Sequence, residues 1–110
     1  MVQSVLVVEG YADLRSTIVA ILKRGDCACD NVRNAEAAVD LLRSHHYDTI
    51  LLSPRLPISD DPVMHFLATS QPGELAKVVL MSEDDADEPL PGRVLCKPFS
   101  DDQLLAEVRR

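Results

Sequence analysis

The segment VLVVEG, residues 5–10, decides the fold. It begins with an unbroken apolar run, Val5 to Val8, in which β-branched side chains predominate. Such a run is typical of a strand that is covered on both faces, and strands of this kind belong to parallel sheets. A helical pattern of apolar residues follows and stops at Gly25. The positions of that pattern are Leu14, Ile18, Ile21 and Leu22.

The same alternation of strand and helix continues along the chain. Further strands are predicted at residues 28–32, 50–52, 78–81 and 94–96. Helices are predicted after Asn34, Asp61 and Ser100, because each of these residues is a favourable N-cap. Gln103 completes a capping box with Ser100. The acidic, proline-containing stretch 82–92 leaves room for only a reduced helix.

Right-handed crossovers turn this pattern into a doubly wound α/β fold, in which a five-stranded parallel sheet has helices on both faces. Ligands bind such sheets beyond the carboxyl ends of the strands. The polar residues expected at those ends are Glu9, Ser53, Ser82 and Lys97. The length of 110 residues fits a single domain, residues 1–110.

The composition limits the partners. The formal net charge of −7 repels the phosphate backbone of nucleic acids and anionic membrane surfaces. No apolar run approaches the roughly 20 residues of a membrane span, and the N-terminus lacks a signal-peptide pattern. We therefore expect a cytoplasmic protein that binds neither nucleic acid nor membrane. Cys27, Cys29 and Cys96 are expected to be small buried residues without a metal.

Four blocks of the sequence resemble the receiver (CheY-like) domains of bacterial response regulators. They are VLVVEGYADLR, YDTILLSPRLP, VVLMS and LCKPFS, which cover residues 5–15, 47–57, 78–82 and 95–100. Their order and spacing match this family nearly end to end. The resemblance implies a flavodoxin-like sheet with strand order 2-1-3-4-5, a reduced fourth helix, and a cis peptide bond before Pro98.

The resemblance also implies where a phosphorylation site would lie. In this family an aspartate at the end of the third strand accepts the phosphoryl group, an acidic pair after the first strand helps to hold magnesium, and a Ser or Thr and a Lys assist. Here Ser53 replaces the acceptor aspartate, and the acidic pair has become Glu9 and Gly10. Ser82 and Lys97 match the assisting residues.

Two further expectations follow from these replacements. With one carboxylate left, magnesium binding is expected to be lost or very weak, and no other cofactor is expected. Lys97 is expected to form a simple ion pair with Glu9 alone. Val94 stands where the family often has an aromatic switch residue, which indicates a wider loss of the switching machinery.

The sequence is therefore interpreted as a pseudo-receiver of a two-component or phosphorelay system. It is expected to act without phosphorylation, by binding a histidine kinase, an output protein or another receiver; a homodimer is left open. One alternative is a residual phosphorelay receiver that is phosphorylated at Asp60 or Asp61. Another is a hydrolase with Ser53 as nucleophile and Lys97 as base, but no oxyanion-hole loop is evident, so no enzymatic activity is expected.

Overall fold

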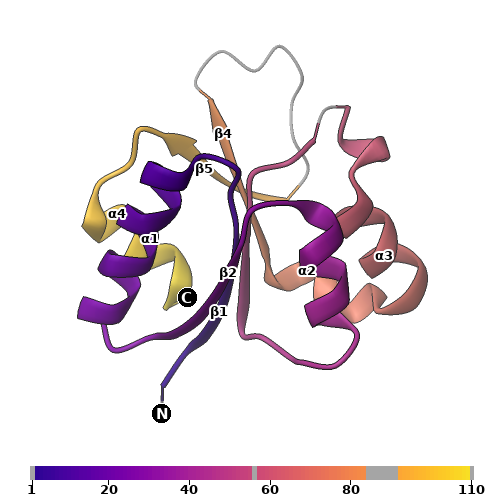
Figure 1. Ribbon diagram of the computed structural model, residues 1–110, viewed down its shortest axis with the longest axis horizontal. Coiled ribbons are helices and arrows are strands. Elements are labelled where there is room, and N and C mark those ends of the chain that lie inside the picture. Colours follow the sequence, from indigo (N-terminus) through magenta and orange to yellow (C-terminus); the bar gives the residue numbers. More distant parts are fainter. Residues whose placement is uncertain (1, 56, 84–91, 110) are drawn as a thin grey trace.

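Five parallel strands form one sheet in the order β2-β1-β3-β4-β5, which confirms the predicted topology (Figure 1). The structure is a computed structural model that describes residues 2–55, 57–83 and 92–109, with Glu83 described in its backbone only. The strands are β1 (Ser4–Val8), β2 (Ala28–Val32), β3 (Thr49–Leu52), β4 (Val78–Glu83) and β5 (Arg93–Lys97). The helices are α1 (Ala12–Arg24), α2 (Ala35–Leu42), α3 (Pro62–Ser70) and α4 (Asp101–Val108), with the 3₁₀ helices η1 (Ile58–Asp60) and η2 (Pro72–Lys77).

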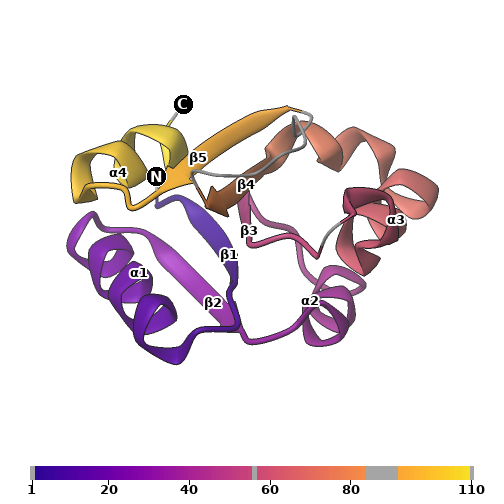
Figure 2. The ribbon, with the colours of Figure 1, turned by 90° about the horizontal axis from the view of Figure 1, so that it is seen from above.

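Helices cover both faces of the sheet. Figure 2 shows α1 and α4 on one side and α2 and α3 on the other. Alternate side chains of β1 enter the two cores: Val5 and Val7 pack toward α1 and α4, whereas Leu6 and Val8 pack toward α2 and α3. The apolar run of the first strand is therefore continuous because both of its faces are buried.

The predicted helix starts are confirmed by their caps. The Asn34 side chain accepts a hydrogen bond from the Ala37 amide at 2.8 Å, and Asp61 caps α3 in the same way. Ser100 and Gln103 form both halves of the predicted capping box. Local side chains thus satisfy backbone donors that have no partner within the helix.

Some features differ from the expectations. The 3₁₀ helix η2 was not predicted, because its sequence has no helical apolar stripe. Cys27 is buried and Cys29 half-buried, but Cys96 is exposed, so its expected burial is wrong. Cys96 lies on β5, an edge strand with a neighbouring strand on one side only. The predicted reduced fourth helix falls almost entirely on residues 84–91, outside the described residues.

The other edge strand of the sheet, β2, carries two polar side chains. Its residues Asp30 and Asn31 are exposed, and the Tyr47 hydroxyl donates a hydrogen bond of 2.7 Å to Asp30. Burial and this carboxylate both raise the pKa of Tyr47, so the phenol stays protonated and can donate. No helix in the described part of the chain is long and apolar enough to cross a membrane.

Candidate functional site

The carboxyl ends of the strands bring the predicted site residues to one edge of the sheet, the upper edge in Figure 1. Glu9 follows β1, Ser53 follows β3, and Lys97 ends β5. The parallel register aligns these ends, because Val8 pairs with Leu52 and Ser53 continues the ladder by donating its amide to the Val8 carbonyl. Residues distant in sequence therefore meet at one place.

Glu9, Ser53 and Lys97 form a closed hydrogen-bonded triangle. The Lys97 ammonium donates to Glu9 Oε1 at 2.8 Å and to Ser53 Oγ at 3.1 Å. Ser53 Oγ donates to the same Glu9 oxygen at 2.5 Å. The predicted Glu9–Lys97 ion pair is thus present. The expectation that Glu9 is the only partner of Lys97 is wrong, because the Ser53 hydroxyl lies within hydrogen-bond distance of both charged groups.

This triangle is shielded from water. Only 2% of Glu9 is exposed, and 13% of the Lys97 side chain. Burial by itself raises the pKa of Glu9, but hydrogen bonds from Lys97, Ser53 and the Tyr11 amide outweigh it, so the pKa is lowered. Glu9 is consequently a carboxylate at neutral pH, and it neutralises Lys97.

The donor set does not suit magnesium. Mg²⁺ takes an octahedral shell of oxygen ligands, usually with carboxylates among them, and here the Lys97 ammonium already binds the Glu9 carboxylate. The described residues contain no group of three or more His, Cys, Asp or Glu side chains that could hold a metal ion. Gly10 has room for a Cβ, which would meet only the Arg33 carbonyl oxygen, at 3.6 Å.

The same geometry disfavours nucleophilic chemistry at Ser53. The Lys97 amine already donates to Glu9 and to Ser53 Oγ, whereas a lysine base must accept the proton of the serine. Glu9, with its lowered pKa, is a weak proton acceptor. A cavity of about 270 Å³ does lie beside Ser53, bordered by Gly10, Arg33 and Arg55. The partners of the serine hydroxyl are Glu9 and Lys97, which are already paired with each other.

Asp61, one of the alternative phosphorylation sites, has a structural role. It is 1% exposed, and its Oδ1 accepts hydrogen bonds from the amides of Val63 and Met64. Its Oδ2 accepts a further bond from the Arg55 amide at 2.6 Å. Both oxygens are therefore engaged in holding the loop after β3 against the start of α3. Asp60 lies in η1 and is exposed.

The remaining predicted residues do not join the triangle. Ser82 is half-buried on β4, and within the described residues its hydroxyl makes no hydrogen bond to Glu9, Ser53 or Lys97. Val94 pairs with Leu80 in the sheet and packs into the core beneath α2 and α3. The peptide bond before Pro98 is cis, as predicted.

Sequence reasoning missed two contacts around the site. The Arg15 guanidinium donates to the Glu9 carbonyl at 2.9 Å, which fixes the loop between β1 and α1. Arg55 joins the loop after β3 to Glu36 on α2, at 3.3 Å. The only sequence signal for these contacts was that Arg15 and Arg55 belong to the same family-like blocks as Glu9 and Ser53, residues 5–15 and 47–57.

The strand order and the position of the site at the strand ends are those of the doubly wound, flavodoxin-like class of α/β folds. Within that class the structure has the fold of response-regulator receiver domains, as comparison with solved structures shows. The chemotaxis response regulator CheY4 of Vibrio cholerae superposes with a TM-score of 0.81 at 16% identity, over 100% of this chain and 98% of that chain.

Two further structures show the same fold. The receiver domain of the sensor histidine kinase PA1611 from Pseudomonas aeruginosa, with magnesium coordinated in its active-site cleft, gives a TM-score of 0.83 at 20% identity over 100% of this chain and 97% of that chain. NtrX from Brucella abortus, in complex with ATP, gives 0.84 at 20% identity, and the match covers 100% of this chain but 26% of that chain. No protein-family profile and no curated protein matches the sequence.

Proposed function

We propose that this chain is a pseudo-receiver: a receiver-type signalling domain that takes no phosphoryl group at the usual position and acts by binding another protein. The observation that carries this proposal is the closed triangle of Glu9, Ser53 and Lys97. In receivers the corresponding lysine assists at the phosphoryl group, whereas here its charge is already neutralised and largely buried.

The loss of the acidic cluster also removes the means of switching. A ligand shifts a conformational equilibrium only by its difference in affinity for the two states. Without an acceptor carboxylate, a magnesium site or an aromatic residue at Val94, little differential affinity for a phosphoryl group remains. The domain then presents a constant surface, and its partner is a histidine kinase, an output protein or another receiver.

The deciding experiment is an amide NMR titration with Mg²⁺, followed by beryllofluoride, which mimics a bound phosphoryl group. We expect no saturable shifts at Glu9, Ser53, Ser82 or Lys97. The matched control is the double variant Gly10→Asp with Ser53→Asp, which restores the acids. A Cβ at position 10 would make only an ordinary contact, 3.6 Å from the Arg33 carbonyl oxygen. Saturable shifts in the unmodified protein would contradict the proposal.

A second measurement separates the alternatives. Acetyl phosphate treatment followed by mass mapping would reveal phosphorylation at Asp60, the exposed member of the alternative pair. We expect no modified aspartate after acetyl phosphate treatment. In a separate experiment, we expect Ser53 to remain unlabelled by a fluorophosphonate probe, since we propose no enzymatic activity. A phosphoryl group found on Asp60 would instead support a residual phosphorelay role.

A further inference from the structure

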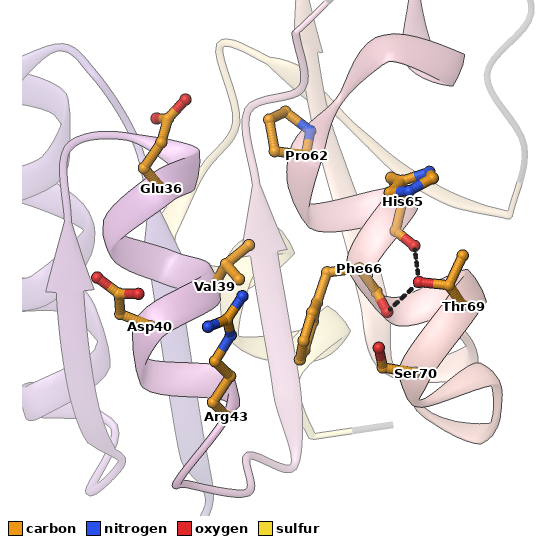
Figure 3. Close-up of a pocket in the computed structure, with 9 residues that line it drawn as sticks. All are labelled: Glu36, Val39, Asp40, Arg43, Pro62, His65, Phe66, Thr69 and Ser70. Atoms are coloured by element: carbon orange, nitrogen blue, oxygen red, sulfur yellow. Dashed lines mark hydrogen bonds between the residues drawn. The ribbon is translucent and has the colours of Figure 1, made fainter.

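A groove runs between α2 and α3 on the outer surface of the molecule (Figure 3). Its volume is about 680 Å³, within the range of about 300 to 1,000 Å³ that is usual for ligand-binding clefts. The side chains that matter for its chemistry are Glu36, Val39, Asp40 and Arg43 on the α2 side and His65 and Phe66 on α3.

The floor of the groove is apolar and aromatic. Val39 and Phe66 are half-buried and point into the space between the helices, as Figure 3 shows. The Arg43 guanidinium lies over the Phe66 ring, 5.8 Å from its centroid. The chain has two phenylalanines and no tryptophan, so half of its phenylalanines face this groove. Aromatic and arginine side chains are the residues that most often dominate binding energy at protein interfaces.

Two acidic residues lie on the α2 rim of the groove. Glu36 and Asp40 lie one helical turn apart, and both are exposed. Glu36 is bound by Arg55 at 3.3 Å, but among the described residues Asp40 makes no hydrogen bond or ion pair. A basic group that approaches this rim can therefore pair with Asp40 without displacing an existing contact. On the opposite side of the groove lies His65.

We propose that this groove docks an amphipathic helix of a partner protein, with apolar side chains on Val39 and Phe66 and a basic side chain beside Asp40. Such helices bind through residues at i, i+3, i+4 and i+7, which match a groove between two helices. The net charge of −7 favours a basic partner. This inference rests on the proposed function, because it names the surface through which the pseudo-receiver binds.

The groove is tied directly to the loop that follows Ser53. The Arg55 amide donates to Asp61, which caps α3, and the Arg55 guanidinium contacts Glu36 in the first turn of α2. One loop thus contacts the starts of both groove-forming helices. The groove is consequently formed without a phosphoryl group. This agrees with the proposed function, which needs a docking surface that does not depend on phosphorylation.

The test is an amide NMR titration with two synthetic helical peptides, one built from leucine and lysine and the other from leucine and glutamate in the same pattern. We expect the lysine peptide to shift the amides of Val39, Asp40 and Phe66, and to bind about tenfold more tightly than the glutamate peptide. The variant Asp40→Lys should remove that preference. The matched control is Asp102→Lys on α4, an exposed acid whose replacement changes the net charge equally.

Each outcome has a defined meaning. Shifts spread evenly over the surface, or equal weakening by Asp40→Lys and Asp102→Lys, would show attraction by net charge alone and would overturn the proposal. If thermal melting shows that Asp40→Lys is unfolded, Asp40→Asn supplies the same comparison. Beryllofluoride shifts at Ser53 would overturn the proposed function, whereas the peptide data alone decide the groove.

Discussion

Glu9 holds its place through a set of donors that no single residue of the chain could supply. Oε1 accepts from Lys97 and Ser53, and Oε2 accepts from the Tyr11 amide at 3.1 Å. An ionised carboxylate can be buried in a protein only when it is paired and hydrogen-bonded in this way. Loss of one donor should therefore lower the free energy of unfolding, because the buried charge of Glu9 is then incompletely compensated.

We expect Lys97→Met to lower the free energy of unfolding at neutral pH by about 3 kcal/mol, because it leaves the buried Glu9 carboxylate without its cation. Urea denaturation measures this change. The matched control is Lys77→Met, which breaks the more exposed pair with Glu74 and should cost less than about 1 kcal/mol. Equal losses in the two variants would show that the Glu9–Lys97 pair contributes no more than a surface pair.

The lowered pKa of Glu9 predicts an acid-sensitive stability. Because the pKa of Glu9 in the folded protein lies below the ordinary value of about 4.5, folding is favoured by the ionised form. This contribution to stability is present above about pH 4.5. It is lost as the pH falls through the folded pKa. We expect the stability difference between the unmodified protein and Glu9→Gln to shrink in urea denaturation series as the pH is lowered from neutral. If the difference in free energy of unfolding between the two proteins grew on acidification, the pKa of Glu9 would be raised by folding and not lowered.

At the scale of elements, the C-terminal end of α1 lies very close to α4. A Cβ on Gly25 would come within 2.6 Å of Leu105 Cδ2 and 3.3 Å of the Arg109 guanidinium. Gly25 has a φ of −86°, so glycine is needed here for the close approach and not for its backbone conformation. This contact sets how tightly the two helices on that face can pack.

We therefore expect Gly25→Ala to lower the free energy of unfolding by about 1 kcal/mol, since the Leu105 side chain must move aside. Gly73→Ala is the control, because a Cβ there meets nothing within 4 Å, and its effect should stay within about 0.5 kcal/mol. Thermal or urea denaturation of the two variants makes the comparison. An unchanged stability in Gly25→Ala would mean that α4 adjusts at no cost.

The helices and the site also show which features could be predicted from the sequence and which could not. The N-caps at Asn34, Asp61 and Ser100 were predictable because capping is local chemistry between neighbouring residues. The 3₁₀ helix η2 was not, because short 3₁₀ segments have no apolar period to detect. At the site, the Glu9–Lys97 pair followed from charge and strand order. The Ser53–Lys97 contact did not, because it depends on side-chain geometry at the sheet edge.

At the scale of the whole molecule, the site joins β1, the first strand of the chain, to β5, the last strand of the chain and an edge of the sheet. The double variant Gly10→Asp with Ser53→Asp places three acids around one lysine, and like charges at close range destabilise the folded state. We expect its melting temperature to fall without magnesium and to rise again as Mg²⁺ is added, because a ligand that binds the folded state stabilises it.

The unmodified protein is the control for this measurement, and its melting temperature should not depend on Mg²⁺ beyond the effect of ionic strength. A calcium-free, chelator-treated sample gives the reference for both proteins. Failure of the double variant to respond would mean that the loss of metal binding involves more than the two missing carboxylates.

The polar side chains of β2 have a consequence for the behaviour of concentrated samples. An edge strand offers unpaired backbone groups to other molecules, and charged side chains along it discourage the addition of a foreign strand. Asp30, held in place by the Tyr47 hydroxyl, puts a negative charge on that edge. Copies of this chain should therefore repel one another along β2, which protects the open sheet from growing into fibrils.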